Sequence, residues 1–151
     1  LAQRGLNVLG VDPSAQMLTI AKRKYPECRF TQDDAYLARS TIPETIDAIL
    51  ARFSLIHVPP AEIPAVLSAW SARMRPGALV AVACQLADSD TATVAEFDHR
   101  VAPAWRWNPD HLAELLADAG FDELWRTVSR PDDDHRFPEA HLVARRCSRT
   151  A

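Results

Sequence analysis

The sequence lacks the features of several specialised protein classes. Its three cysteines, Cys28, Cys84 and Cys147, are widely spaced and form no C-x-x-C pair, which supports neither a disulfide framework nor a zinc site. No apolar run approaches the roughly 20 residues of a membrane span, and no signal peptide is visible. With a net charge of -3 and scattered basic residues, the chain shows no electrostatic footprint for nucleic acid. We therefore expect a cytoplasmic protein that acts on small molecules.

Two short apolar runs that each end in a carboxylate are the most informative feature present. Residues 7–11 precede Asp12 and residues 29–31 precede Asp33 and Asp34, with one helix-length segment between the runs. Acids that follow neighbouring parallel strands lie at the carboxyl edge of a sheet, where open α/β folds bind nucleotides. A carboxylate only accepts hydrogen bonds, so it suits a ribose diol or an adenine amino group and repels phosphate. The pattern predicts a nucleoside-binding α/β domain.

The rest of the chain alternates between helix and strand signals. Ser14 caps a predicted helix with Met17 and Leu18 on its packed face, and a second helix spans residues 61–74. A third begins at Asn108, where a capping residue precedes proline. A tight turn is predicted at 75–77 and an irregular segment over 85–107. The remaining strands are expected at 46–51, 78–84, 121–129 and 141–145.

The order of several segments resembles the class I S-adenosylmethionine-dependent methyltransferases, in particular bacterial small-molecule members. The matching segments are residues 10–14 with Met17 and Leu18, Asp34 with Ala35, 46–49, 53–57, 75–77 and 119–121. The resemblance implies a Rossmann-like, mostly parallel sheet with helices on both faces, in which 141–145 is an antiparallel last strand inserted beside the fifth. It also implies S-adenosyl-L-methionine as cofactor, a small-molecule acceptor and no metal.

The resemblance assigns the cofactor to residues near the ends of three strands: Asp12, Met17, Asp34, Ala35, Ala51 and Arg52. Asp12 would bind the ribose hydroxyls with Met17 beside the adenine, and Asp34 and the Ala35 amide would bind the adenine edge. The carbonyls of Ala51 and Arg52 would accept from the methionine ammonium. No catalytic residue is assigned.

The family's glycine-rich turn is missing from this sequence. It should lie roughly 20 residues before the acid that ends the second strand, yet only 11 residues precede Asp12. Gly5 and Gly10 lie on the wrong side of the helix to supply it. We expect a partial domain over 1–146, without its first strand and first helix, followed by a tail at 147–151. The chain is then a fragment of a longer protein, which we favour, or a defective cofactor binder with a rearranged core.

The acceptor is expected to contact His57, His99, Trp105 and Trp107. His57 could serve as a general base, or it could pack and bond backbone. The two tryptophans could line an apolar pocket or anchor the segment to the sheet. Asp33 is interpreted as a solvated neighbour of Asp34, and the acidic run at 132–135 as a solvated loop rather than a metal site.

Two other functions stay open. An NAD(P)-dependent dehydrogenase fragment also places an acid after its second strand, although Asp34 and the turn at 75–77 argue against it. A non-catalytic remnant would keep the α/β shell and act through dimerisation. Without a central strand, exposed strand edges predict self-association, so a homo-oligomer or a missing N-terminal segment is expected.

Overall fold

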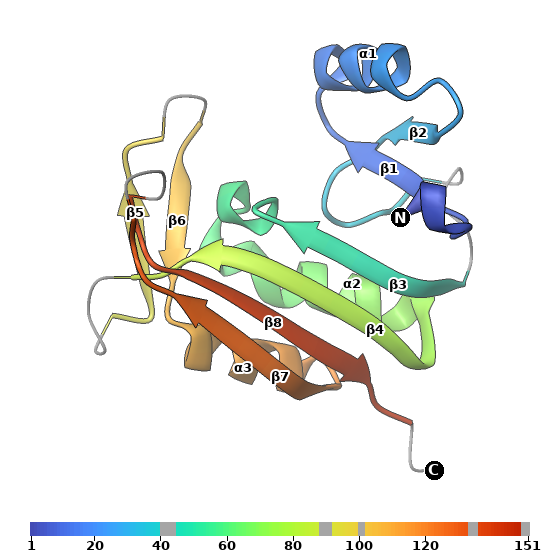
Figure 1. Cartoon of the computed structure of the whole chain (residues 1–151). Helices are drawn as coiled ribbons and strands as arrows, with labels where there is room; N and C mark the ends of the chain where they lie inside the picture. Colours follow the sequence, from blue (N-terminus) through green and yellow to red (C-terminus); the bar gives the residue numbers. More distant parts are fainter. Residues whose placement is uncertain (40–44, 88–91, 100–101, 133–135, 149–151) are drawn as a thin grey trace. The chain divides into compact units, whose positions relative to one another are not determined.

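The chain folds into two compact units, residues 1–44 and 45–151. The computed structural model describes residues 1–39, 45–87, 92–99, 102–132 and 136–148 (Figure 1). No helix in these ranges is long and apolar enough to cross a membrane. The expectation of a domain over 1–146 with a tail at 147–151 stays a prediction.

The first unit is a small parallel βαβ motif. A short 3-10 helix, η1 (Ala2–Arg4), ends at Gly5, whose φ of 80° is the left-handed conformation that glycine adopts without strain. Strand β1 (Leu9–Asp12), helix α1 (Ala15–Lys24) and strand β2 (Arg29–Gln32) follow. β1 and β2 pair in parallel, with Asp12 opposite Gln32. The carboxyl ends of both strands therefore share one edge.

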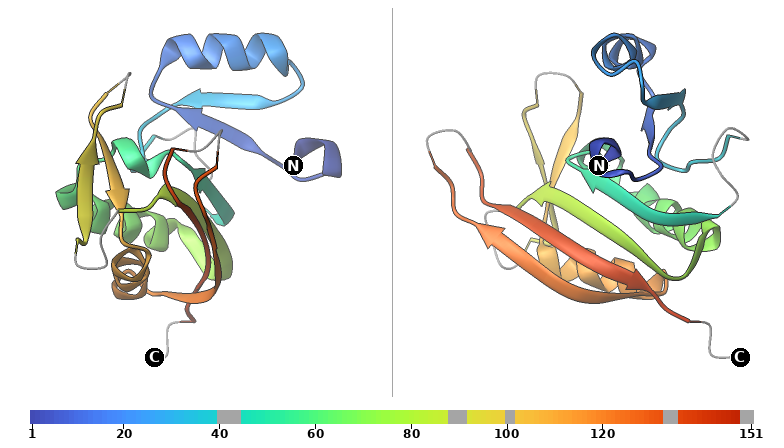
Figure 2. Two further views of the ribbon diagram at one scale, coloured as in Figure 1. Left: turned by 60° about the vertical axis from the view of Figure 1, so that its left-hand side comes forward. Right: turned by 45° about the vertical axis from the view of Figure 1, so that its right-hand side comes forward.

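The second unit is built on a four-stranded mixed sheet. Its strands are β3 (Ile46–Arg52), β4 (Met74–Gln85), β7 (Phe121–Ser129) and β8 (Glu139–Arg146), in the order β3-β4-β8-β7 (Figure 2). β3 is parallel to β4, whereas β8 is antiparallel to both β4 and β7. The predicted reversed last strand is confirmed, and so is the Rossmann-like α/β class.

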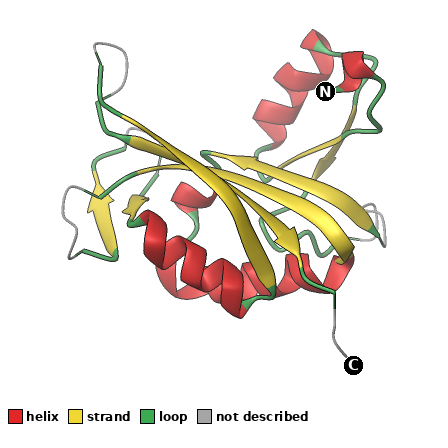
Figure 3. Cartoon of the chain, turned by 60° about the horizontal axis from the view of Figure 1, so that its bottom comes forward, coloured by secondary structure: helices red, strands yellow, loops and turns green. Residues whose placement is uncertain are grey.

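Helices α2 (Ile63–Arg73) and α3 (Pro109–Asp118) cover the same face of this sheet (Figure 3). Apolar residues at helical spacing on α2 face the strands and are at most 3% exposed: Ile63, Val66, Leu67 and Trp70. The strand residues Val80, Val82 and Leu142 are also buried, and α2 contacts β4. On the other face, Leu50, Leu79 and Trp125 are 60%, 40% and 52% exposed.

The turn predicted at 75–77 is part of β4. The strand starts at Met74, and its pairing with β3 skips from Met74 opposite Ile46 to Leu79 opposite Ala48. The residues in between form an irregularity in the ladder, and Gly77 takes a φ of 83° there. The prediction of a separate turn before the strand was wrong, because these residues belong to β4 and form an irregularity in its pairing with β3.

The segment predicted to be irregular contains a β-hairpin. β5 (Val94–Phe97) and β6 (Ala104–Trp107) pair antiparallel, and Trp107 also forms a bridge with Leu86 just beyond β4. Two short 3-10 helices, η2 (Leu55–His57) and η3 (Pro60–Glu62), precede α2, and η2 packs against β4 and β6. The irregular prediction was wrong because strands of four residues carry too little pattern to identify.

Candidate nucleoside and acceptor sites

Asp12 lies at the carboxyl end of β1 and is half-buried. Its Oδ1 accepts a hydrogen bond of 2.7 Å from the Ser14 amide, which turns the chain into α1. Ser14 in turn caps α1 by accepting from the Met17 amide at 3.2 Å. The Oδ2 atom of Asp12 has no hydrogen bond to the residues that the structure describes. It is therefore available to a donor such as a ribose hydroxyl.

Asp33 is buried, in contrast to the prediction that it is a solvated neighbour. Its side chain accepts from two backbone amides at 2.9 Å each, with Oδ1 on the Asp34 amide and Oδ2 on the Arg39 amide. The Arg39 guanidinium lies 3.8 Å away. At 6% exposure, this carboxylate is held by the donors that a buried charge requires. Asp33 thus shapes the loop that follows β2.

Asp34 and Met17 are exposed in the same unit. Asp34 accepts from the Tyr36 amide at 2.9 Å, and this short turn includes the half-buried Ala35. Met17 is 54% exposed, so its predicted place on the packed face of α1 was wrong, while Leu18 is buried as predicted.

Asp12 and Asp34 lie at the same edge of the two-stranded sheet. Asp12 at the end of β1 pairs with Gln32 at the end of β2, and Asp34 follows Gln32 by two residues.

In the second unit, Ala51 and Arg52 form the end of β3. Ala51 is buried, whereas Arg52 is exposed and its guanidinium lies 4.6 Å from the centre of the Phe53 ring. Phe53 has a φ of 52° and its amide donates to the Ala83 carbonyl. β3 pairs with β4 on one side, and no described strand of this sheet pairs with the other side.

His57 and His99 are brought together as predicted acceptor residues. The His57 Nδ1 atom lies 3.1 Å from the Pro103 carbonyl oxygen, and the two imidazole rings meet edge to face at 4.7 Å. Phe97 contacts His99 at 5.8 Å and Phe137 at 5.4 Å. This aromatic cluster consists of His57, Phe97, His99 and Phe137, and it lies between η2, the β5–β6 hairpin and the segment before β8.

The two tryptophans differ in their surroundings. Trp105 is half-buried on β6, opposite Glu96. Trp107 is 1% exposed and stacks on His111 at 6.3 Å, so it anchors the hairpin to the core. Its contact with an acceptor stays a prediction, and the position favours the anchoring alternative for this residue.

The sequence reasoning missed the residues that organise these sites. Phe97, Phe137 and Pro103 contribute through contacts distant in sequence, and nothing in their local pattern distinguishes them from ordinary packing residues. Asp33 did carry a signal, because one of two adjacent acids after a strand can turn inward to bind backbone amides.

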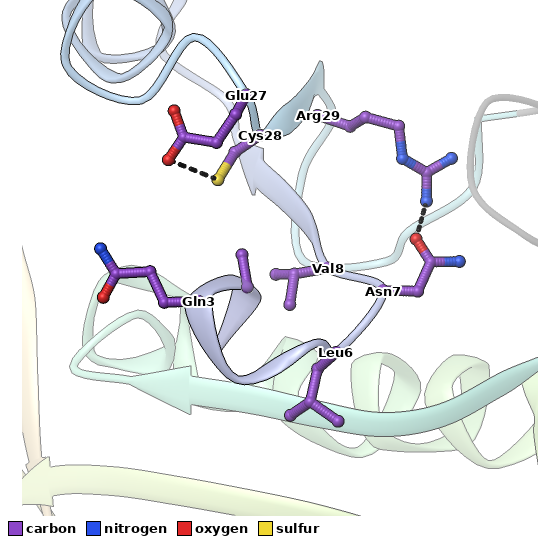
Figure 4. Close-up of a pocket in the computed structure, with 8 residues that line it drawn as sticks. Gln3, Leu6, Asn7, Val8, Glu27, Cys28 and Arg29 are labelled. Carbon is purple, nitrogen blue, oxygen red and sulfur yellow. Dashed lines mark hydrogen bonds between the residues drawn. The ribbon is translucent and has the colours of Figure 1, made fainter.

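Two surface hollows lie away from all of these residues. In the first unit, a hollow of about 350 Å³ is found near the amino ends of β1 and β2 (Figure 4). In it, the Arg29 guanidinium donates to Asn7 Oδ1 at 2.6 Å. In the second unit, a hollow of about 480 Å³ is lined by residues that include Ser71, Asp118 and Arg146. Neither contains a predicted site residue.

A metal centre finds no support in the described part of the chain, where no three potential ligands are grouped. The sequence analysis interpreted the acidic run at 132–135 as a solvated loop rather than a metal site. Positions 133–135 of this run lie outside the described residues. All three cysteines are free.

Two features define a Rossmann-like α/β protein. One is the parallel βαβ motif with carboxylates at its edge, and the other is the mixed sheet with its reversed strand. The family model described as a methyltransferase domain matches residues 1–77, and the chain belongs to this family. An uncharacterized methyltransferase of Geobacillus kaustophilus is 32% identical over 83 residues, covering 55% of this chain and 39% of that protein. One of Bacillus cytotoxicus is 30% identical over 79 residues, covering 52% and 37%. The matches thus span about two-fifths of the length of these curated relatives.

Solved structures share the fold at low sequence identity. A SAM-dependent methyltransferase from Methanosarcina mazei superposes with a TM-score of 0.81 at 14% identity, covering 97% of this chain and 84% of that chain. The 1,6-didemethyltoxoflavin-N1-methyltransferase of Burkholderia thailandensis, solved with 1,6-didemethyltoxoflavin and S-adenosylhomocysteine, gives 0.76 at 19% identity, covering 97% and 64%. The fold expectation is confirmed over nearly the whole chain.

Proposed function

We propose that this protein binds S-adenosyl-L-methionine and transfers its methyl group to a small-molecule acceptor. The observation that carries the proposal is the placement of Asp12 and Asp34 after two parallel strands that end in register at one edge. Family membership supports methyl transfer. A small-molecule acceptor is supported by the Burkholderia enzyme, which was solved with such a compound.

The described contacts of the first unit fit the nucleoside half of this cofactor. Asp12 keeps Oδ2 for the ribose hydroxyls, and the exposed Asp34 can accept from the adenine amino group. The exposed thioether chain of Met17 can lie against the adenine face. Charge-assisted hydrogen bonds of this kind contribute about 1.5 to 3 kcal/mol each. The roles of Ala35, Ala51 and Arg52 stay predictions.

For methyl transfer, the main contribution of the protein is to align the acceptor with the methyl group. The bound cofactor supplies a methyl group already activated by its positive sulfur. Holding the acceptor in line with the carbon–sulfur bond can contribute about 7 to 11 kcal/mol through orientation alone. A base is needed only for acceptors that arrive protonated.

Calorimetric titration with S-adenosylhomocysteine and, separately, with NADH tests the proposal. We expect saturable binding of the first ligand only, weakened about 10- to 150-fold by Asp12→Asn, the equivalent of one or more lost charge-assisted bonds. Asp118→Asn is the matched control, since Asp118 is exposed on α3, and it should bind normally. Binding of NADH instead would favour the dehydrogenase, and binding of neither would favour the non-catalytic domain.

A further inference from the structure

The carboxylate of Glu139 is mostly buried and lacks a hydrogen-bond donor. Its side chain is 12% exposed, and none of the described residues donates a hydrogen bond to it. The Nε2 atom of His141 lies 3.9 Å from Glu139 Oε2, a distance too long for a hydrogen bond. Asp33, by contrast, is buried with a backbone amide on each of its oxygens. Because a buried carboxylate without donors is costly, Glu139 is a candidate for ligand binding.

A second acceptor lies next to this carboxylate in the sheet. Gln85, the last residue of β4, is directly opposite Glu139, the first residue of β8. The Gln85 amide oxygen, Oε1, is buried and accepts no hydrogen bond from the described residues. Residues directly opposite in an antiparallel pair have Cβ atoms about 4.5 to 5.5 Å apart on one face. Two neighbouring acceptors without donors suit a ligand group that carries two N–H bonds.

Both residues lie on the sheet face opposite α2 and α3 (Figure 3). Side chains alternate between the two faces along a strand, and the buried neighbours Cys84 and Ala140 belong to the helix-covered face. His141, two positions after Glu139, shares the opposite face with it. Since β3 and β4 are parallel, the end of β4 is also the edge at which β3 ends. The two acceptors therefore face away from the helices, at the carboxyl end of two parallel strands.

Phe53 provides an apolar wall on the β3 side of this site. Its φ of 52° is in the left-handed region, which a bulky residue adopts only where its surroundings hold it. The Phe53 ring meets the His141 ring edge to face, with 6.2 Å between their centres. Ala83 lies between them on β4, directly opposite both Arg52 and His141, and is 2% exposed. The Phe53 ring therefore extends across β4 over the small Ala83 side chain.

The end of β3, to which the family resemblance assigns the methionine part of the cofactor, lies close to this site. Arg52, Ala83 and His141 are directly opposite one another on three neighbouring strands. Because neighbouring strands are about 4.8 Å apart, the backbones of Arg52 and His141 are about 10 Å apart. A small ligand held by Glu139 is therefore within reach of a group bound at the end of β3.

We propose that Glu139 and Gln85 bind the amino group of a primary amine, and that this amine is the methyl acceptor. The inference rests on the proposed function for its methyl donor. An acceptor that arrives as the ammonium first releases one proton to water. Its two N–H groups then donate to the carboxylate and the amide oxygen, and the nitrogen keeps its lone pair for the methyl carbon.

The charges of the transfer step fit this arrangement. The nitrogen attacks the methyl carbon, the carbon–sulfur bond breaks with its electron pair going to sulfur, and the products are an N-methylammonium and the neutral thioether. The positive charge thus moves from sulfur to nitrogen. The Glu139 carboxylate stabilises the charge that develops on the nitrogen, since it is fixed beside it before the reaction begins.

Titration of the full chain with benzylamine and, separately, with benzyl alcohol tests the amine site, with S-adenosylhomocysteine present. We expect wild type to bind benzylamine at least about tenfold more tightly than the alcohol. Glu139→Gln should weaken benzylamine about 10- to 150-fold, the equivalent of one lost charge-assisted bond, and Gln85→Met about 2- to 12-fold. Glu114→Gln is the matched control, since Glu114 is 74% exposed on α3, and it should bind benzylamine normally.

Two results would overturn the inference. One is equal binding of benzylamine and benzyl alcohol by wild type, which needs no variant to fold. The other is unchanged benzylamine binding in Glu139→Gln. The affinity for S-adenosylhomocysteine should be the same in wild type and Glu139→Gln, and a loss of it would assign Glu139 to the amino group of the cofactor instead.

These outcomes separate the two proposals. If S-adenosylhomocysteine binds but benzylamine binding does not depend on Glu139, the further inference fails and the methyltransferase proposal stands. If S-adenosylhomocysteine does not bind while benzylamine binding still depends on Glu139, the proposed function fails and the amine site stands.

Discussion

Replacing Asp33 with alanine should loosen the loop that presents Asp34, although the two acids are neighbours. Asp33 is 6% exposed and accepts from the amides of Asp34 and Arg39, whereas the exposed Asp34 side chain accepts, among the described residues, from the Tyr36 amide. The buried residue therefore carries the structural role and the exposed one is free for a ligand. The two alanine variants form a matched pair.

The expected magnitudes follow from these bonds. Two hydrogen bonds to a charged acceptor at about 1.5 to 3 kcal/mol each give about 3 to 6 kcal/mol for Asp33→Ala. The ion pair with Arg39 adds little, because the Arg39 side chain is 63% exposed. Asp33→Asn keeps one acceptor oxygen and should lose about half as much. Asp34→Ala removes one exposed bond and should cost no more than about 1 kcal/mol.

Hydrogen exchange of single amides, followed by NMR, measures this locally. In Asp33→Ala the Asp34 and Arg39 amides should exchange at least about 100-fold faster, while the Leu67 amide in α2 should be unchanged. Asp34→Ala should leave the Arg39 amide protected. Equal exchange at Arg39 in the two variants would refute the assignment of separate roles.

Three further outcomes are expected. Gly10→Ala places a Cβ 2.5 Å from a ring atom of Phe30, so urea denaturation should show a loss of about 1 to 3 kcal/mol that Phe30→Leu restores; no loss would contradict the close packing. Asn108→Ala removes the acceptor that caps α3 and should cost about 0.5 to 2 kcal/mol in thermal melts, with Asn108→Ser close to wild type. Burial raises the pKa of Cys84 to about 12, so mass spectrometry after alkylation near pH 8 should find Cys28 modified first, and equal modification would argue against burial.

The elements that could be predicted are those with strong local signals. Asn108, Pro109 and Asp110 define the start of α3 by capping chemistry alone, and the apolar run at 78–84 lies within β4. The reversal of β8 has no local signal and came from the family resemblance. The β5–β6 hairpin was missed because its short strands depend on each other and on the bridge to Leu86.

The residues of the candidate sites also divide into those that local sequence predicts and those that depend on distant contacts. The position of Asp12 could be predicted from the sequence, because a carboxylate at the end of a strand is located once the strand itself is correctly predicted. The burial of Asp33 depends on the path of the chain as far as Arg39, and the orientation of His57 depends on Pro103, 46 positions later. Such contacts form only when distant segments pack, so no spacing in the sequence reveals them.

The position of β8 has a consequence for synthesis. β8 is synthesised after β3, β4 and β7, yet it lies between β4 and β7, and its Arg146 donates to the carbonyls of Ser71 and Gly120 beside the ends of α2 and α3. Until β8 has emerged, one backbone edge of β4 has no strand to pair with. The nascent chain therefore holds an unfinished sheet while residues 86–138 are being synthesised, a period in which a chaperone could shield it.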